Sequence, residues 1–165
     1  MASETINNSR ARAIWQALET VTDPEIPVLT VVDMGIIAAV RVDGARVTVE
    51  VTPTFVGCPA VDVIRENIKK AITDLGEPDV AVNLVFDPPW TADRMTDEGR
   101  RKLKEFGLAP PIRGLVQVGL SPPSVRCPYC DSALTDLESA FGPTLCRAIY
   151  YCRDCRQSFE HFKNV

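Results

Sequence analysis

Residues 36–52 consist of two β-rich runs on either side of an Asp-Gly pair: Ile36-Ile37-Ala38-Ala39-Val40-Arg41-Val42, then Asp43-Gly44-Ala45, then Arg46-Val47-Thr48-Val49-Glu50-Val51-Thr52. An Asp-Gly pair between such runs is the strongest short signal for a β-hairpin. In the second run valine alternates with polar residues, so we expect a strand with one buried and one wet face. The sequence therefore predicts an antiparallel pair at the start of a small sheet.

Helices and one more strand are expected around this hairpin. A first helix, capped by Ser9, ends at Asp23-Pro24-Glu25-Ile26-Pro27, because two prolines cannot continue it. Apolar residues at helical spacing predict a second helix over 60–75, and residues 80–86 read as a strand. A polar helix over 96–106 follows. The order α-β-β-α-β-α predicts an α+β sandwich with helices on one face of a small sheet.

Composition narrows the class of protein. The chain has 165 residues, 18 Lys+Arg and 22 Asp+Glu, a net charge of -4 and six cysteines. No apolar run approaches the roughly 18 residues of a membrane span, and the N-terminal residues lack the pattern of a secretory signal. We therefore expect a cytoplasmic protein with no membrane partner, whose thiols stay reduced. The acidic balance argues against nucleic acid as the main partner.

Proline pairs suggest a division of the chain. They stand at Ala109-Pro110-Pro111 and Ser121-Pro122-Pro123, and residues 124–165 carry equal numbers of acidic and basic side chains. Paired prolines stiffen a segment and remove backbone donors. We predict an N-terminal domain over 8–107, a proline-rich linker over 108–124 and a small module over 125–165.

The small module contains two C-x-x-C knuckles, Cys127-Pro128-Tyr129-Cys130 and Cys152-Arg153-Asp154-Cys155. Each knuckle offers two thiolates from one turn, and two knuckles complete a tetrahedron. The expected ligands are Cys127, Cys130, Cys152 and Cys155. Zinc is the leading metal, and iron in a rubredoxin-like site is the alternative. So short a segment needs such a metal to fold, and we expect strands on both sides of the second knuckle, in a β-rich zinc ribbon.

The module contains two further side chains that could bind a metal. Cys146 could replace a knuckle partner, although a packing or hydrogen-bonding role fits its isolation better. His161, the single histidine, is expected at the surface. Four thiolates leave no open position on the metal, so we expect no catalysis there.

Cys58 stands apart from the other cysteines, in the loop before the second helix. The macrodipole and unpaired N–H groups of a helix N-terminus favour a thiolate, which is a better nucleophile or ligand than a thiol. The competing interpretation is a small buried hydrophobic residue. The carboxylates of Asp23, Glu25 and Asp33 could assist a metal or a proton transfer, but capping of turns is the more common use of such residues.

Four motifs carry a resemblance to a known family. They are Asp23-Pro24-Glu25-Ile26-Pro27, Val32-Asp33-Met34-Gly35-Ile36, Thr52-Pro53-Thr54 with Gly57-Cys58-Pro59, and Phe86-Asp87-Pro88-Pro89-Trp90-Thr91. In this order and spacing they resemble the SufT-like domain of iron–sulfur assembly factors. A SufT-like domain followed by a four-cysteine ribbon resembles the PaaD family of accessory subunits of phenylacetyl-CoA epoxidase, which acts in aerobic phenylacetate degradation. Residues 141–148 and 159–163 strengthen this resemblance.

The resemblance implies a maturation role without independent catalysis. PaaD-like proteins are thought to help assemble the iron–sulfur centre of the epoxidase reductase, which is therefore the expected partner. Carried over, Cys58 is the candidate ligand for a transient iron–sulfur cluster or iron, with Asp23 or Glu25 as the nearby carboxylate. One thiolate cannot hold a cluster alone, so this hypothesis includes a cluster shared between two chains of a homodimer.

Two other functions stay open on the sequence. A zinc-ribbon scaffold or nucleic-acid-binding protein is favoured by Arg126, Arg147, Arg153 and Arg156, but the neutral module weakens the phosphate-binding contribution. A thiol oxidoreductase would need a readily reacting knuckle thiol, whereas such redox motifs usually occur singly.

Overall fold

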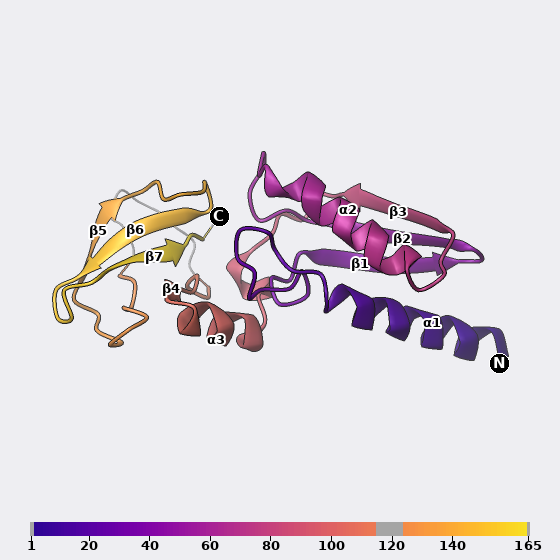
Figure 1. Cartoon of the computed structure of the whole chain (residues 1–165), viewed down its shortest axis with the longest axis horizontal. Helices are drawn as coiled ribbons and strands as arrows, with labels where there is room; N and C mark the ends of the chain where they lie inside the picture. Colours follow the sequence, from indigo (N-terminus) through magenta and orange to yellow (C-terminus); the bar gives the residue numbers. More distant parts are fainter. Residues whose placement is uncertain (1, 115–123, 165) are drawn as a thin grey trace. The chain divides into compact units, whose positions relative to one another are not determined.

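A computed structural model describes residues 2–114 and 124–164 (Figure 1). The chain divides into two compact units, residues 1–90 and 91–165, and each is described by itself. The fold is of the α+β class, with one sheet in each unit. In the part of the chain that the structure describes, no helix is both long and apolar enough to cross a membrane.

The first unit contains the predicted hairpin. β1 (Ile37–Asp43) pairs antiparallel with β2 (Arg46–Val51), and Asp43 stands opposite Arg46 across the turn. β3 (Asp79–Leu84) adds parallel to β2, so the order is β1-β2-β3. As the alternation predicted, Val47, Val49 and Val51 are buried.

Two helices complete this unit. α1 (Ala2–Leu18) packs on α2 and β1, and α2 (Ala60–Thr73) packs on β3 and connects the parallel strands. Ile64, Ile68 and Ile72 form the buried face of α2, as their helical spacing predicted. The capping role predicted for Ser9 is wrong, because α1 begins at Ala2 and Ser9 lies within it. Serine costs only about half a kcal/mol inside a helix, so it does not mark a start by itself.

The loop after β3 closes the first unit. Trp90 is buried, and its Nε1 donates a hydrogen bond of 2.8 Å to the backbone oxygen of Met34. Trp90 is therefore a core residue rather than a stacking platform. A bridge between Thr22 and Thr30 closes the loop that contains Asp23 and Glu25.

The second unit contains a four-stranded sheet of order β4-β7-β6-β5. Its strands are β4 (Leu108–Ala109), β5 (Thr135–Ser139), β6 (Arg147–Cys152) and β7 (Ser158–Phe162). β5, β6 and β7 pair antiparallel, whereas β4 lies parallel to β7. β6 and β7 confirm the strands expected beside the second knuckle.

The structure departs from the predicted domain ranges at their boundary. The short helix η1 (Ala92–Arg94) and α3 (Asp97–Glu105) belong to the second unit, and α3 packs on β4. The predicted linker starts at residue 108, yet Leu108 and Ala109 are strand residues of the ribbon sheet. Two residues are too few for a periodic pattern, which is why the sequence did not reveal this strand. The proline pair at 122–123 lies outside the described residues.

Candidate metal centre and candidate thiol site

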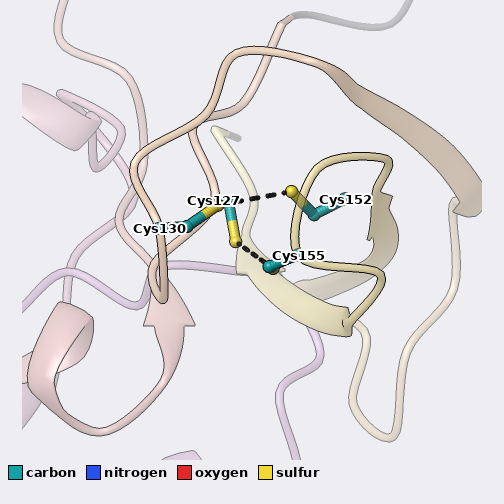
Figure 2. Close-up of side chains that lie close together, drawn as sticks. All are labelled: Cys127, Cys130, Cys152 and Cys155. Carbon is teal, nitrogen blue, oxygen red and sulfur yellow. Dashed lines mark hydrogen bonds between the residues drawn. The ribbon is translucent and has the colours of Figure 1, made fainter.

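The four knuckle thiols converge at one point of the second unit. The Sγ atoms of Cys127, Cys130, Cys152 and Cys155 all lie within 4.8 Å of one another, and Figure 2 shows them pointing inward. The first knuckle lies ahead of β5, and the second begins at the last residue of β6. Cys127 and Cys152 are buried, Cys155 is half-buried, and Cys130 is exposed. All four predicted ligands are thus brought together.

The spacing of the sulfur atoms suits a tetrahedral metal. Cys127 Sγ lies 3.6 Å from Cys155 Sγ, and Cys130 Sγ lies 3.6 Å from Cys152 Sγ. Zinc–sulfur bonds of about 2.3 Å place the corners of a tetrahedron roughly 3.8 Å apart. The donor set and its geometry therefore fit zinc, or iron in the same S4 environment.

The thiols of the second knuckle have different acidities. Hydrogen bonds from the backbone N–H groups of Cys155 and Asp154 lower the pKa of Cys152 to about 7. Burial raises the pKa of Cys155 to about 12. Cys152 and Cys155 therefore differ in how readily each gives up the proton that a metal must displace.

The remaining thiol of the module lies elsewhere. Cys146 Sγ is 3.1 Å from Thr144 Oγ1 and is not among the four clustered sulfur atoms. This agrees with the expected hydrogen-bonding role. The expected surface position of His161 is wrong: only 2% of the residue is exposed, and its Nδ1 lies 3.2 Å from the backbone oxygen of Ala109. Burial lowers the pKa of His161 to about 4.

Cys58 occupies a pocket of the first unit. Its backbone oxygen accepts a hydrogen bond of 3.2 Å from Val61 N–H, so the residue lies just ahead of α2. The cavity of about 20 Å³ is lined by nine residues: Asp23, Met34, Ile36, Val51, Pro53, Thr54, Cys58, Val61 and Ile64. Such a volume holds about one water molecule or one ion. The thiol is half-buried, so it is neither a sealed core residue nor fully exposed.

The three carboxylates singled out in the sequence for this site differ in their positions. Asp23 lines the same pocket as Cys58, although 35 positions separate them in the sequence. Glu25 is exposed and is not among the lining residues. Asp33 is buried, and its carboxylate accepts a hydrogen bond of 3.1 Å from Thr30 N–H, which is the turn-capping role expected for it.

Thr52 carries a buried hydroxyl, and its two chain neighbours line the pocket. Thr52, noted in the motif Thr52-Pro53-Thr54, stands between two lining residues, Val51 and Pro53. It is 1% exposed, and its Oγ1 has no hydrogen-bond partner among the residues that the structure describes. The apolar residues that line the pocket, Met34, Ile36, Val51, Val61 and Ile64, were not predicted as neighbours, because nothing in their sequence spacing brings them together.

Comparison with known proteins covers both units. Residues 11–84 match the family described as iron–sulfur cluster assembly protein, and residues 115–163 match the PaaD zinc beta ribbon domain. A protein of Escherichia coli K12, named as a putative 1,2-phenylacetyl-CoA epoxidase subunit, is 43% identical over 161 residues, which are 98% of this chain and 97% of that protein.

Two further proteins are similar to part of the chain. The Fe-S protein maturation auxiliary factor YitW of Bacillus subtilis is 41% identical over 85 residues, which are 50% of this chain and 82% of that factor. The crystal structure of a domain of unknown function, DUF59, from Bacillus anthracis superposes with a TM-score of 0.57 at 28% identity, covering 61% of this chain and 96% of that one.

Proposed function

Since the chain belongs to the PaaD family, with an iron–sulfur cluster assembly domain ahead of a zinc β-ribbon, we propose that it assists the assembly of an iron–sulfur centre in a phenylacetyl-CoA epoxidase system. The relatives support the two halves of this proposal. The Escherichia coli relative is named as an epoxidase subunit, and the Bacillus subtilis relative is named as a maturation factor for Fe-S proteins. The expected client is the iron–sulfur reductase of the system.

The pocket that Cys58 and Asp23 share is the observation that carries the proposal. A thiolate and a carboxylate are both ligands for iron. The cavity of about 20 Å³ has room for a single ion, so a cluster would have to be held at its mouth. One thiolate leaves most positions of a cluster open, and these would be filled by a second copy of the chain or by the client's cysteines. The incomplete ligand set is what transfer of the cargo requires.

The ribbon has a different role in this proposal. Cys127, Cys130, Cys152 and Cys155 would hold a zinc ion, which supplies folding free energy to a module with a small core. Four thiolates fill its coordination sphere, so no substrate reaches the metal. We assign to the ribbon the contact with the client rather than a chemical step.

The test compares two single-thiol variants. Cys58→Ser and Cys146→Ser each change one half-buried cysteine outside the four-sulfur cluster. Each is produced anaerobically together with the epoxidase reductase, and iron and sulfide per reductase are measured. We expect Cys58→Ser to lower cluster content while folding and zinc content stay unchanged, and Cys146→Ser to behave like the natural chain. Full cluster content with Cys58→Ser would exclude Cys58 as the transfer ligand.

A further inference from the structure

The segment from α3 to Ile112, here called the α3–β4 segment (residues 97–112), is built into the ribbon sheet. Leu108 stands opposite Glu160 and Ala109 opposite His161 in the parallel pairing with β7. Ala109 is fully buried, in an apolar cluster that also contains Cys127 and Cys152. Two of the four metal-ligand candidates are thus part of the core against which this segment packs.

Contacts with the first knuckle hold the helical end of the segment. Lys104 Nζ lies 2.9 Å from Asp131 Oδ1, directly after the first knuckle. Gly107 approaches Tyr129, inside the knuckle, so closely that a Cβ atom would lie 3.1 Å from the phenol oxygen. The turn that places two of the thiols therefore also forms the surface on which the end of α3 rests.

A side chain from the other end of the module holds the strand end. Asn164 Oδ1 accepts a hydrogen bond of 2.8 Å from Ile112 N–H, and Asn164 Nδ2 donates to the backbone oxygen of Ile112. His161 Nδ1 contacts Ala109 O one strand away. Both contacts come from residues that follow the second knuckle in the sequence.

The segment has little structure of its own. α3 is nine residues long and buries only Gly99 and Leu103, whereas isolated helices shorter than about 12 residues are marginal in water. β4 has two residues. Arg100 adds hydrogen bonds to the backbone oxygens of Pro111 and Ala92. The contacts that tie the segment to the rest of the module come from the first knuckle, β7 and Asn164.

We infer that metal binding by the four cysteine thiolates determines whether the α3–β4 segment is folded. The metal fixes the two knuckles relative to each other, and the knuckles with β7 provide the docking surface for α3 and β4. Without metal the surface is lost, and the chain after Trp90 becomes a flexible tether. The metal state of the ribbon is thus transmitted to the stretch that directly follows the iron–sulfur assembly domain in the sequence.

The first experiment measures amide hydrogen exchange in the full chain, under reducing conditions, with one equivalent of zinc or after removal of zinc by a chelator. With zinc we expect protected amides in α3 and β4. Without zinc their exchange should be at least roughly tenfold faster, while the amides of α2 in the first unit stay unchanged. Equal protection of α3 with and without zinc would overturn the inference.

A second experiment keeps the metal in place and loosens only the docking. Asn164→Ala removes a side chain that makes two hydrogen bonds to the backbone of Ile112. Ser139→Ala is the matched control, because Ser139 Oγ also makes two hydrogen bonds to one backbone residue, Phe141, in a loop away from the segment. Both variants are loaded with zinc, their zinc content is measured, and they are treated briefly with trypsin.

We expect both variants to hold one zinc per chain, with faster cleavage after the basic residues of α3 in Asn164→Ala alone. Arg100, Arg101, Lys102 and Lys104 supply the cleavage sites. Unchanged cleavage of Asn164→Ala would show that the segment does not depend on the ribbon for its order. Equal acceleration in Ser139→Ala would show general loosening of the module, and would overturn the specific link as well.

Discussion

The carboxylate of Asp23 holds the turn that carries Glu25. Asp23 Oδ1 accepts hydrogen bonds from the backbone N–H groups of Glu25, at 2.7 Å, and of Ile26, at 2.9 Å. The same residue lines the pocket of Cys58. Asp23 therefore has a structural role that is independent of any role toward iron, and a simple deletion of its side chain would confuse the two.

Substitution of Asp23 in two ways separates these roles. Asp23→Asn keeps the accepting oxygen and should leave the free energy of unfolding of the first unit nearly unchanged. Asp23→Ala removes the acceptor and should cost about 1–3 kcal/mol, because a buried backbone donor, that of Ile26, and a part-buried one, that of Glu25, lose a charged partner. Urea unfolding of both variants measures this difference.

The asparagine variant then tests the chemistry. If the negative charge of Asp23 assists the cargo, Asp23→Asn should lower cluster content of the reductase although it folds normally. Full client maturation by Asp23→Asn would leave Asp23 with the turn-holding role alone.

Zinc content should depend on each knuckle thiol. Cys155→Ser replaces a sulfur that lies 3.6 Å from Cys127 Sγ, and leaves three thiolates for a tetrahedral ion. A structural zinc site supplies apparent binding free energy on the order of 10–16 kcal/mol, so loss of one ligand should unfold the module as well as release the metal. We expect zinc per chain to fall from one to near zero by atomic emission, and the near-ultraviolet signal of the ribbon to be lost. Retention of a full equivalent of zinc would contradict the four-sulfur site.

Much of the first unit could be predicted because its residues alternate. The periodicity of Val47, Val49 and Val51 identified a half-buried strand, and Asp43-Gly44 located the turn. The helical spacing of Ile64, Ile68 and Ile72 predicted the buried face of α2 in the same way. The parallel position of β3 beside β2 has no such pattern, since it depends on where the α2 connection returns the chain.

Apart from the start of α1, the errors lie where a partner distant in the sequence decides the structure. The polar α3 looks like a surface helix that closes the preceding domain, but its place is set by contacts with residues such as Tyr129 and Asp131. A single histidine that alternates with Phe159 and Phe162 on a strand-like run is more often a surface residue than a ligand, yet the partner of His161 is the carbonyl of Ala109, 52 residues away. The knuckle thiols were predictable from spacing because each pair is local, whereas only the family resemblance, and no local pattern, pointed to Asp23 beside Cys58.

Acid should destabilise the second unit through His161. Its pKa of about 4 in the folded chain lies below the ordinary value of 6.5, because burial disfavours the imidazolium. Below pH 6.5 the unfolded chain therefore binds a proton that the folded chain does not. Stability should fall as the pH drops from 6.5 toward 4, with a limiting slope of about 1.4 kcal/mol per pH unit, and should be independent of this residue above that range.

Acid also protonates thiolates and weakens zinc binding, so a matched variant is needed. His161→Gln keeps a donor for Ala109 O but does not titrate. The difference in unfolding free energy between the two chains, at saturating zinc, isolates the histidine. Parallel pH profiles of the two chains would show that His161 is not the titrating group.

Gly107 and Gly114 should respond differently to a methyl group. Both have positive φ, 87° and 63°, where an alanine costs about 1–2 kcal/mol. A Cβ atom at Gly107 meets the Tyr129 ring, whereas nothing lies within 4 Å of one at Gly114. Gly107→Ala should therefore lower the thermal midpoint of the second unit more than Gly114→Ala. Equal losses would mean that the Tyr129 ring moves aside freely.

The unpartnered hydroxyl of Thr52 should reveal a conflict between stability and function. Its Oγ1 is buried without a hydrogen bond among the described residues, and an unmade hydrogen bond of this kind costs about 1–3 kcal/mol. Valine has the same shape without the hydroxyl, so Thr52→Val should stabilise the first unit by about 1 kcal/mol in urea unfolding. Thr30→Val is the control within the same unit, because Thr30 Oγ1 accepts a hydrogen bond of 3.0 Å from Asp33 N–H and its removal should destabilise.

The functional side of the Thr52 prediction follows from its position. Thr52 is not itself a lining residue, but both of its chain neighbours line the pocket of Cys58, and unsatisfied buried polar groups in native proteins concentrate near functional sites. We therefore expect Thr52→Val to be more stable than the natural chain and yet to lower cluster content of the reductase. A variant that is both more stable and fully active would show that the hydroxyl serves neither purpose.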